Sequence, residues 1–576
     1  MSARSTNTLI VSHSISIYTR RARLTLSNFQ AVAAGHDSSS ACHPNSIYIS
    51  ATMAASMEDV RVLASPARTT HHTWALTFFC RPELYLQPSS IEQLQTIVRA
   101  AHQFKKTVTV TGAGHSPSDI TMTKDWLINL DDFDNVLSFS RHESGLFTDV
   151  RVEAGIRIYQ LNAVLASRGL ALQNLGSISD QSVAGIISTG THGSSAYHGL
   201  ISQQIVDITL LLASGDLLTV SPTVQPDLFR AAILSLGKLG IITHVTVRAI
   251  PSFTVHSFQE IVDFDKLLED WDTVWTSKEY VRVWWFPYSR KCILWRAQKS
   301  GKSLSAPRES FYGTWLGRKL YELLLWFATR IYKRAMPAVE RFVFRRQYGW
   351  QSTYGQGGSE AVQNSVEALN MDCLFRQFVN EWALPLKHGV EVLKQVDQAV
   401  TNAAESGAYY VHAPIEVRCS NCSYPNEETT PFEIIEKSGG IGALPGNTLR
   451  PLLDYSPVVP YAYTEPISNE NLTLYLNATM YRPFGHDPPI GQWYREFEDI
   501  MVAYSGKPHW AKNFIGKSPE KTTDVPSKDG EMIGLANVFD SWYGEDGTKY
   551  KAIRLKLDRE GIFLGGKEWA VRNGVI

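Results

Sequence analysis

The run of residues 109–118 constrains the fold more than any other part of the sequence. It begins within a continuous β-branched segment, residues 107–111, which predicts a buried strand. Two glycines then allow the backbone to approach a ligand closely, and successive N–H groups with the hydroxyls of Ser116 and Ser118 can bind a pyrophosphate. The run matches neither a GxGxxG motif, because Ser118 takes the place of the third glycine, nor a Walker A loop. Alone, it predicts no more than a tight turn.

Two further glycine-rich runs change that interpretation. Gly176, Gly185, Gly190 and Gly193 lie among serines and threonines between residues 174 and 193. So many small side chains leave a gap in the packing that something must fill. A third run, residues 237–242, leads into an expected strand and can pack on the same ligand. A planar, extended cofactor with phosphates would fill the space that the runs leave.

Two regions with different sequence patterns follow the N-terminal part of the chain. Residues 80–250 alternate short strands with amphipathic helices, which predicts a mixed α+β region. Residues 251–505 are richer in aromatic strand-like pieces, and Trp284, Trp285 and Trp295 are expected beside the sugar pocket or its sheet. Within them, residues 305–350 form a basic, aromatic block. This block either lies on a membrane surface as an amphipathic helix or is a core helix with solvated charges.

Composition excludes several classes of protein. The 576 residues carry 55 basic and 56 acidic side chains, so a nucleic-acid partner is not expected. No run approaches the roughly eighteen apolar residues of a spanning helix. The six cysteines are scattered, and the one CxxC, Cys419 to Cys422, lacks a second ligand pair at metal spacing. No metal site is expected.

The N-terminal residues 1–60 differ from the rest. Four arginines precede the first acidic residue, Asp37, and serine is abundant. This composition is typical of a mitochondrial presequence, and a disordered extension fits it equally well. A mitochondrial, membrane-associated protein and a cytoplasmic one both remain open.

At this point a family resemblance emerges. The three glycine runs in this order resemble the FAD-binding domain of the vanillyl-alcohol oxidase superfamily. GAGHSPSD at 112–119 together with PHWAK at 508–512 resembles its sugar-1,4-lactone oxidases, over about residues 70–570. The resemblance implies an α+β, two-domain, PCMH-type FAD-binding fold with an antiparallel-sheet substrate cap. The FAD-binding domain would span 75–252, the cap 253–505, and a C-terminal segment, 506–576, would return to the flavin.

The resemblance also implies roles for the cofactor side. His115 lies where these oxidases bond a histidine nitrogen covalently to the flavin 8α-methyl group. Gly176 matches the position at which alanine shields the flavin from O2 in similar plant dehydrogenases, so glycine implies an oxidase. His192 and Ser188 are expected beside the isoalloxazine ring or the ribityl chain. The implied FAD-binding residues are Gly112, Ala113, Gly114, His115, Ser116, Pro117, Ser118, Gly176, Ser177, Ser182, Gly185, Ser188, Thr189, His192, Gly193, Gly240, Ile241 and Ile242.

On the substrate side, Glu416 and Arg418 resemble the family's Glu-x-Arg pair. Residues two apart in a strand face the same side, so both would point into one pocket. His509 and Lys512 come from the C-terminal motif, and a lysine near flavin N1 would stabilise negative charge on the reduced ring. These four residues are the catalytic candidates.

The implied reaction is oxidation of an aldono-1,4-lactone by O2, with hydride transfer from C2 to flavin N5 and release of H2O2. The chain is most similar to the fungal members, which implies D-arabinono-1,4-lactone as the substrate and D-erythroascorbate as the product. L-Gulono- and L-galactono-1,4-lactone remain alternatives, as does a dehydrogenase that reduces cytochrome c. A flavin-holding, membrane-associated scaffold without turnover would predict damage among Glu416, Arg418 and Lys512, yet all three are present.

Overall fold

The computed structural model describes residues 55–371, 373–464, 466–516 and 532–576. The N-terminal leader expected from the sequence lies, up to residue 54, outside the described residues. Its last residues belong to the fold instead: Ser56 caps α1 (Met57–Arg61), and Val60 is fully buried. The folded part of the chain therefore includes residues 55–60, which the sequence analysis assigned to the extension.

A small parallel sheet carries the first glycine run. Its three strands, in the order β3-β5-β4, pair in parallel, and β4 is the β-branched segment expected from the sequence. α2 (Ile91–Phe104) packs its apolar face on this sheet, with Ser90 accepting a hydrogen bond from Gln93 N–H as N-cap. The strand bounds are β3 (Leu84–Leu86), β4 (Val108–Thr111) and β5 (Trp126–Asn129).

A second, antiparallel sheet follows in the chain. Its strands lie in the order β10-β9-β11-β7-β6, and β8 pairs with β11. The loops and short helices between its strands carry the second and third glycine runs. Its elements are β6 (Val136–Arg141), β7 (Thr148–Glu153), α3 (Ile158–Ala166), β8 (Leu170–Ala171), α4 (Val183–Ser188), β9 (Ile205–Leu211), β10 (Leu217–Val220), α5 (Pro226–Ala232) and β11 (Ile241–Pro251).

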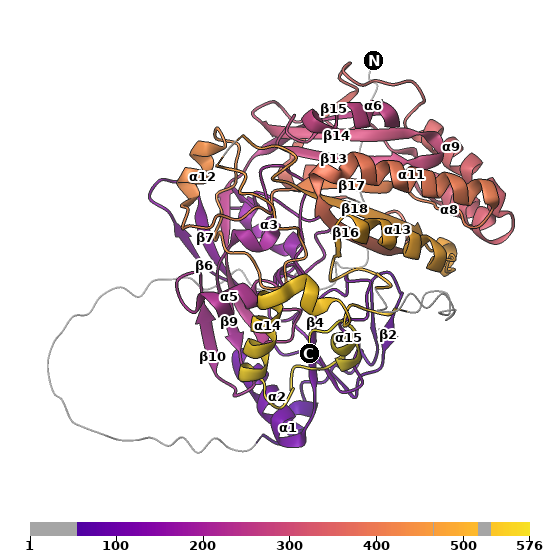
Figure 1. Cartoon of the computed structure of the whole chain (residues 1–576). Coiled ribbons are helices and arrows are strands. Elements are labelled where there is room, and N and C mark those ends of the chain that lie inside the picture. The colour runs from indigo at the N-terminus through magenta and orange to yellow at the C-terminus, as the bar shows by residue number, and fades with distance from the viewer. Residues whose placement is uncertain (1–54, 372, 465, 517–531) are drawn as a thin grey trace, which may run out of the picture. The chain divides into compact units, whose positions relative to one another are not determined.

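The third sheet is the largest and is antiparallel throughout. Its strand order is β15-β12-β14-β13-β17-β18-β16-β19. α11 (Gly389–Ser406) and α13 (Gly491–Ala503) lie along one side of it (Figure 1) and pack their apolar residues into its core. The strands are β12 (Thr254–Asp263), β13 (Tyr280–Phe286), β14 (Lys291–Ser300), β15 (Ser359–Asn364), β16 (Gln377–Pro385), β17 (Ile415–Ser420), β18 (Thr473–Tyr481) and β19 (Lys507–Pro508).

The basic block of residues 305–350 forms two helices, α8 (Trp315–Arg330) and α9 (Met336–Gln347). Tyr321 and Leu325 of α8 pack against Val339 and neighbours of α9 in a separate apolar cluster. The block is therefore a packed helix pair with one buried face rather than a single helix. Within the described ranges, no helix combines the length and apolar character needed to cross a bilayer.

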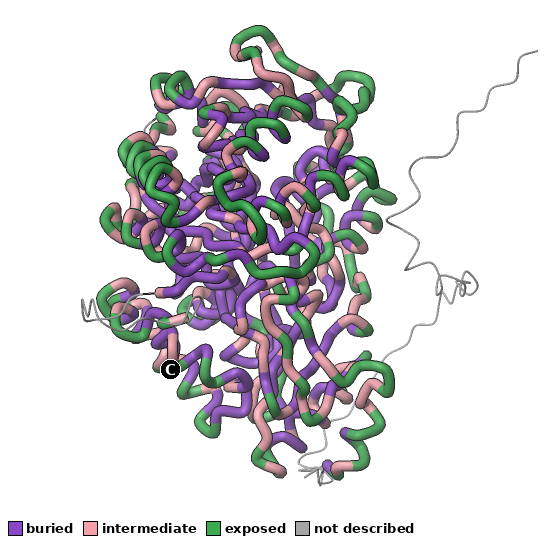
Figure 2. The backbone as a smooth tube through the Cα atoms, turned by 90° about the vertical axis from the view of Figure 1, so that its right-hand side faces the viewer, coloured by how far each residue is buried: buried purple, intermediate pink, exposed green. Residues whose placement is uncertain are grey.

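The segment after β19 returns to the first two sheets. α14 (Phe539–Leu557) and α15 (Lys567–Arg572) lie beside β4, α5 and β9 in Figure 1. Arg572 is 2.7 Å from Asp119, and the Tyr550 hydroxyl donates to the Ser235 carbonyl over 2.6 Å. Figure 2 shows buried backbone running through the interior of the folded part, with exposed segments around it. β19 thus links the large sheet to a C-terminal segment that closes over the glycine runs.

Candidate active site at the junction of two cavities

Two cavities meet at the glycine runs. The first has a volume of about 940 Å³ and the second about 1100 Å³. His115, Gln181 and Thr189 line both, so the cavities share a wall. A long ligand in the first cavity would therefore present one end to whatever occupies the second.

The first cavity is lined by backbone that approaches closely from all three glycine runs. A Cβ at Gly112 would lie 2.4 Å from Ser182 Oγ, and one at Gly240 would lie 2.7 Å from the Leu211 carbonyl oxygen. Gly114 has φ +69°, a conformation that L side chains rarely adopt. Ser182 caps the short helix α4 by accepting from Gly185 N–H over 3.2 Å. The shape of this cavity thus depends on glycine where the chain turns.

His115 stands at the shared wall with one free nitrogen. Its ring stacks on Trp74 with centroids 5.6 Å apart, and its Nε2 lies 4.0 Å from Asp180. Nδ1 is buried and has no hydrogen-bond partner among the described residues. Burial, opposed by the Asp180 carboxylate, lowers the pKa of His115 to about 4. The imidazole is therefore neutral at pH 7 and keeps a lone pair for another group.

The donor set of the first cavity fits FAD. Two buried polar atoms on its wall, Thr109 Oγ1 and His115 Nδ1, lack partners among the described residues. Lys238 is also on the wall, and its buried ammonium donates a hydrogen bond to the Gly565 carbonyl over 2.7 Å. Burial lowers the pKa of Lys238 to about 8, so an anion beside it would be favourable. A nucleotide with a pyrophosphate and a planar ring supplies both the charge and the acceptors.

Most of the residues expected to bind FAD line one or both of the two cavities. Those on the wall of the first are Gly112, Ala113, Gly114, His115, Ser116, Ser182, Gly185, Ser188, Thr189, Gly240 and Ile242. Pro117, Ser177 and His192 line the second cavity instead. Gly176, Gly193, Ser118 and Ile241 lie on neither wall. Ile241 packs in the core because neighbours in a strand face opposite sides.

Gly176 lies directly behind the second cavity. A Cβ at this position would meet the Thr191 methyl at 2.7 Å, and Thr191 lines the cavity. Even the smallest side chain at Gly176 must therefore displace the Thr191 side chain on the cavity wall.

A row of side chains across the large sheet forms the floor of the second cavity. Trp284 on β13 pairs with Glu416 on β17, Glu416 pairs with Asn477 on β18, and Asn477 pairs with Glu381 on β16. Directly opposed residues point to the same face of a sheet, and all four line this cavity. Of the tryptophans expected there, Trp284 lines the cavity, while Trp285 and Trp295 are core residues.

Glu416 and Arg418 lie together on that face, as the sequence spacing predicts. Arg418 forms an ion pair with Glu416 and donates to Ser177 Oγ over 2.6 Å. Both side chains are almost completely buried. The pair leaves one wall of the cavity with polar groups and no net charge.

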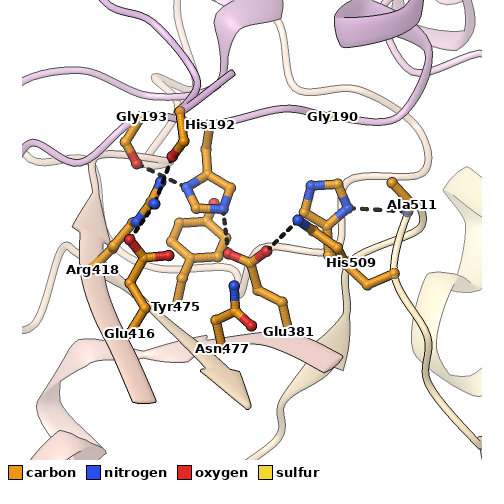
Figure 3. Close-up of polar contacts among 12 residues, drawn as sticks. Gly190, His192, Gly193, Glu381, Glu416, Arg418, Tyr475, Asn477, His509 and Ala511 are labelled. Atoms are coloured by element: carbon orange, nitrogen blue, oxygen red, sulfur yellow. Dashed lines mark hydrogen bonds and ion pairs between the residues drawn. The ribbon is translucent and has the colours of Figure 1, made fainter. Parts of the chain in front are cut away.

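At the other end of this row, Glu381 lies between His192 and Lys512. Its Oε1 is 2.9 Å from His192 Nε2 and its Oε2 is 3.1 Å from Lys512 Nζ. Figure 3 shows the His192 ring between Gly193 and Glu381, beside Tyr475. Burial alone would raise the pKa of Glu381, but Lys512 and His192 outweigh it and hold that pKa well below its ordinary value. We refer to Glu381, His192 and Lys512 as the Glu381 cluster.

His509 lies beside this cluster in a neutral state. The Ala511 N–H donates to His509 Nδ1 over 3.1 Å, so the ring proton is on Nε2. Burial, reinforced by Lys512, holds the pKa of His509 well below 6.5. Potential ligand atoms of His192, Glu381 and His509 lie within 4.8 Å of one another. Since His192 and Lys512 already bond the two oxygens of Glu381, we describe these contacts as a hydrogen-bonded polar cluster rather than a metal site.

The motifs in the sequence miss Glu381, Asn477 and Lys238. Glu381 stands in the sequence as the single acid of residues 377–385, and Asn477 stands in an Asn-Ala-Thr sequence typical of a glycosylation sequon. Neither signal indicates which strands pair. The three residues become recognisable only through strand register and burial.

Comparisons with known proteins agree with this geometry. Residues 82–221 match the FAD-binding domain family, and residues 245–573 match the D-arabinono-1,4-lactone oxidase family. D-arabinono-1,4-lactone oxidase of Yarrowia lipolytica is 57% identical over 88% of this chain and 98% of its own length. The Saccharomyces cerevisiae enzyme of that name is 46% identical over 87% and 96%. A solvent-stable cholesterol oxidase has the same fold, with a TM-score of 0.66 at 17% identity over 86% of this chain and 96% of its own. These matches confirm the resemblance and the fold class inferred from the motifs.

Proposed function

Because the chain belongs to the D-arabinono-1,4-lactone oxidase family, we propose that it oxidises D-arabinono-1,4-lactone with FAD and O2. The C2 carbinol of the lactone becomes a carbonyl, and O2 becomes H2O2. The 2-keto lactone then enolises to D-erythroascorbate. One observation carries the proposal: a cavity that fits FAD shares a wall with a second cavity lined by acids, cations and amides that suit a polyhydroxylated lactone.

The roles of the side chains follow from their positions. Bound FAD supplies the hydride acceptor and the reaction with O2. Glu416 and Asn477 on the sheet floor would hold sugar hydroxyls, and Arg418 would orient the lactone carbonyl. Lys512 on the opposite wall would stabilise negative charge. A lactone held in one fixed orientation reacts faster, because binding has already met the entropic cost of aligning it.

The proposed activity is tested by peroxide release. Purified holoenzyme is supplied with D-arabinono-, L-gulono- and L-galactono-1,4-lactone under air, and H2O2 and cytochrome c reduction are both recorded. We expect peroxide with D-arabinono-1,4-lactone at the highest kcat/KM. Cytochrome c reduction without peroxide would instead identify a dehydrogenase, and no turnover with any lactone would contradict the proposal.

We further propose that FAD is bonded covalently through His115. The partner-free Nδ1 of a neutral, buried imidazole at the shared wall supports this, because an unprotonated nitrogen is the nucleophile that such a bond needs. After acid precipitation, the yellow colour should stay in the pellet of the wild-type protein and leave the pellet of His115→Ala. His71→Ala is the matched control, since His71 is a buried ring beside the same turn whose Nε2 is 3.0 Å from Thr121 Oγ1. Colour in the wild-type supernatant would contradict the bond.

Gly176 supports an oxidase over a dehydrogenase. A Cβ there would press Thr191 toward the second cavity, narrowing the space available to O2. Gly176→Ala should lower peroxide formation about tenfold or more while reduction of an artificial dye persists. Gly301→Ala is the control, because a Cβ at Gly301 meets nothing within 4 Å. An unchanged ratio of peroxide to dye reduction in Gly176→Ala would remove this support.

We also propose that α8 rests on an anionic membrane surface. Trp315 and Leu316 are 76% and 65% exposed, and Phe327 is 41% exposed. Basic residues flank them, as in interfacial helices: Arg318, Lys319, Arg330, Lys333 and Arg334. Joint replacement Trp315→Ser with Leu316→Ser should weaken sedimentation with anionic phospholipid vesicles about tenfold or more. Val458→Ser, at an isolated residue that is 85% exposed, should change nothing, and equal binding of all three proteins would contradict the proposal.

Residues 1–54 are proposed to direct the protein to mitochondria, on the basis of their arginine-rich, acid-poor composition. A fluorescent protein fused to residues 1–54 should then enter mitochondria. Retention of the fusion in the cytoplasm would favour a plain N-terminal extension.

A further inference from the structure

The ring of His192 is placed between two acceptors. Its Nδ1 lies 2.9 Å from the Gly193 carbonyl oxygen, and its Nε2 lies 2.9 Å from Glu381 Oε1. A carbonyl can only accept a hydrogen bond, so Nδ1 must carry a proton. The Glu381 carboxylate also bonds Lys512 through its other oxygen, so an N–H at His192 Nε2 would give each carboxylate oxygen a donor. The geometry therefore offers an acceptor to each ring nitrogen of His192, which is the environment of an imidazolium.

The remaining groups around the ring do not supply or remove that charge at neutral pH. Tyr475 on β18 stacks on His192 at 3.6 Å, and burial holds the pKa of its phenol well above 10. His509, 5.9 Å from His192, is neutral because of burial. Lys512 on the same segment bonds to the second oxygen of Glu381. Across the cavity, Glu416 and Arg418 compensate each other.

The charges in the Glu381 cluster do not cancel. With an imidazolium at His192, this ring and Lys512 share one carboxylate, and the cluster has a net positive charge. Glu381 is 3% exposed, so the ions interact with little screening by water. The carboxylate also holds both cations in place, since each bonds to a different oxygen.

We propose that Glu381 is a positioning residue of the oxidation, which keeps His192 doubly protonated and holds Lys512 at the cavity wall. The His192 and Lys512 side chains then point their N–H donors and positive charge at the oxygen atoms that gain negative charge in the reaction. The inference rests on the proposed lactone oxidation, which it deepens. It assigns a task to a residue outside both sequence motifs.

The chain offers a matched control. Glu279 forms a cluster of the same composition with His198 Nε2 at 2.9 Å and Lys299 Nζ at 3.0 Å, which we call the Glu279 cluster. None of its three residues lines either cavity. Glu279→Gln therefore removes an equivalent buried carboxylate without touching the site.

The first experiment compares pH profiles of kcat in the wild type, Glu381→Gln, Glu381→Asp and Glu279→Gln. Loss of the Glu381 carboxylate removes the charge that retains the second proton of His192. The alkaline fall in kcat of Glu381→Gln should then begin more than about one pH unit lower than in the wild type. Glu381→Asp should recover part of the shift, and Glu279→Gln should show none. An unmoved profile in Glu381→Gln, or an equal shift in Glu279→Gln, would overturn the proposal.

A second readout does not depend on activity. In holoenzyme with nitrogen-15 histidine, a doubly protonated ring gives two similar nitrogen resonances, while a neutral ring gives two well-separated ones. At pH 7, the signals lost in His192→Asn should be the similar pair. A separated pair would overturn the proposal even if Glu381→Gln failed to fold. An imidazolium signal in a protein that oxidises no lactone would instead contradict only the proposed function.

Discussion

The Glu381 cluster and the Glu279 cluster use the same three side-chain types at nearly the same distances, but they differ in what surrounds the histidine. His192 Nδ1 faces the Gly193 carbonyl, whereas His198 Nδ1 is buried without a hydrogen-bond partner among the described residues. Burial lowers the pKa of His198 against the pull of Glu279. His198 is therefore neutral at pH 7, with its one ring proton directed at Glu279.

This difference teaches that a histidine–carboxylate pair does not fix the charge of the ring by itself. One additional carbonyl turns the arrangement at His192 into a cationic donor, and position beside a cavity gives that charge something to act on. The Glu279 cluster, away from both cavities, ties β13 to the loop that follows the second glycine run. We therefore expect the Glu381 cluster to serve the reaction and the Glu279 cluster to serve stability.

Replacement of the lysine in each cluster should give the largest difference in kcat/KM between the two clusters. Lys512→Ala removes a charged donor from the cavity wall and should lower kcat/KM about 10²–10³-fold, as loss of a fixed transition-state donor does. Lys299→Ala should change kcat/KM less than about twofold, because Lys299 is 34% exposed and outside the cavities. Steady-state peroxide assays measure both, and comparable losses would erase the distinction.

Replacement of the histidine in each cluster should give the second-largest difference, in kcat and in Tm. His192→Asn keeps a polar side chain but cannot carry the charge, and we expect kcat to fall about 10–100-fold with little change in Tm. His198→Asn should leave kcat unchanged and lower Tm. The comparison breaks if His198→Asn loses as much activity as His192→Asn.

Glu279→Gln should cost stability rather than rate. It weakens a buried hydrogen-bonded contact, and we expect a loss of about 1–3 kcal/mol in the free energy of unfolding. Chemical denaturation measures this loss in parallel with kcat, which should stay at the wild-type value. A variant as stable as the wild type would show that the Glu279 cluster contributes nothing to the fold.

Acidification should reduce the difference in unfolding free energy between Glu279→Gln and the wild type. His198 and Lys299 hold the pKa of Glu279 below its ordinary 4.5 despite burial, so its stabilisation is present above pH 4.5 and is lost as pH falls below it. The difference in unfolding free energy between the two proteins should therefore narrow below pH 4.5, by at most about 1.4 kcal/mol per unit of pKa shift. If the difference in unfolding free energy stayed constant down to the pH of acid denaturation, it would contradict the lowered pKa of Glu279.

The sequence predicts some of this site and not the rest, for physical reasons. The turn at Gly112 and the pair Glu416–Arg418 follow from local geometry, because glycine conformations and strand periodicity act over a few residues. Glu381 reaches the site through pairing of β16 with β18, nearly a hundred residues later, and no local pattern encodes that register. The membership of Ile242 but not Ile241 in the cavity wall likewise depends on which face of β11 is turned inward.

The most direct test mixes each holoenzyme with D-arabinono-1,4-lactone in the absence of O2 and follows the flavin absorbance. The account predicts that the wild type and Glu279→Gln bleach at the same rate, that Glu381→Gln bleaches at least about tenfold more slowly, and that admission of air restores the colour with release of H2O2. Equal bleaching of Glu381→Gln and the wild type, or equally slow bleaching of Glu279→Gln, would contradict it.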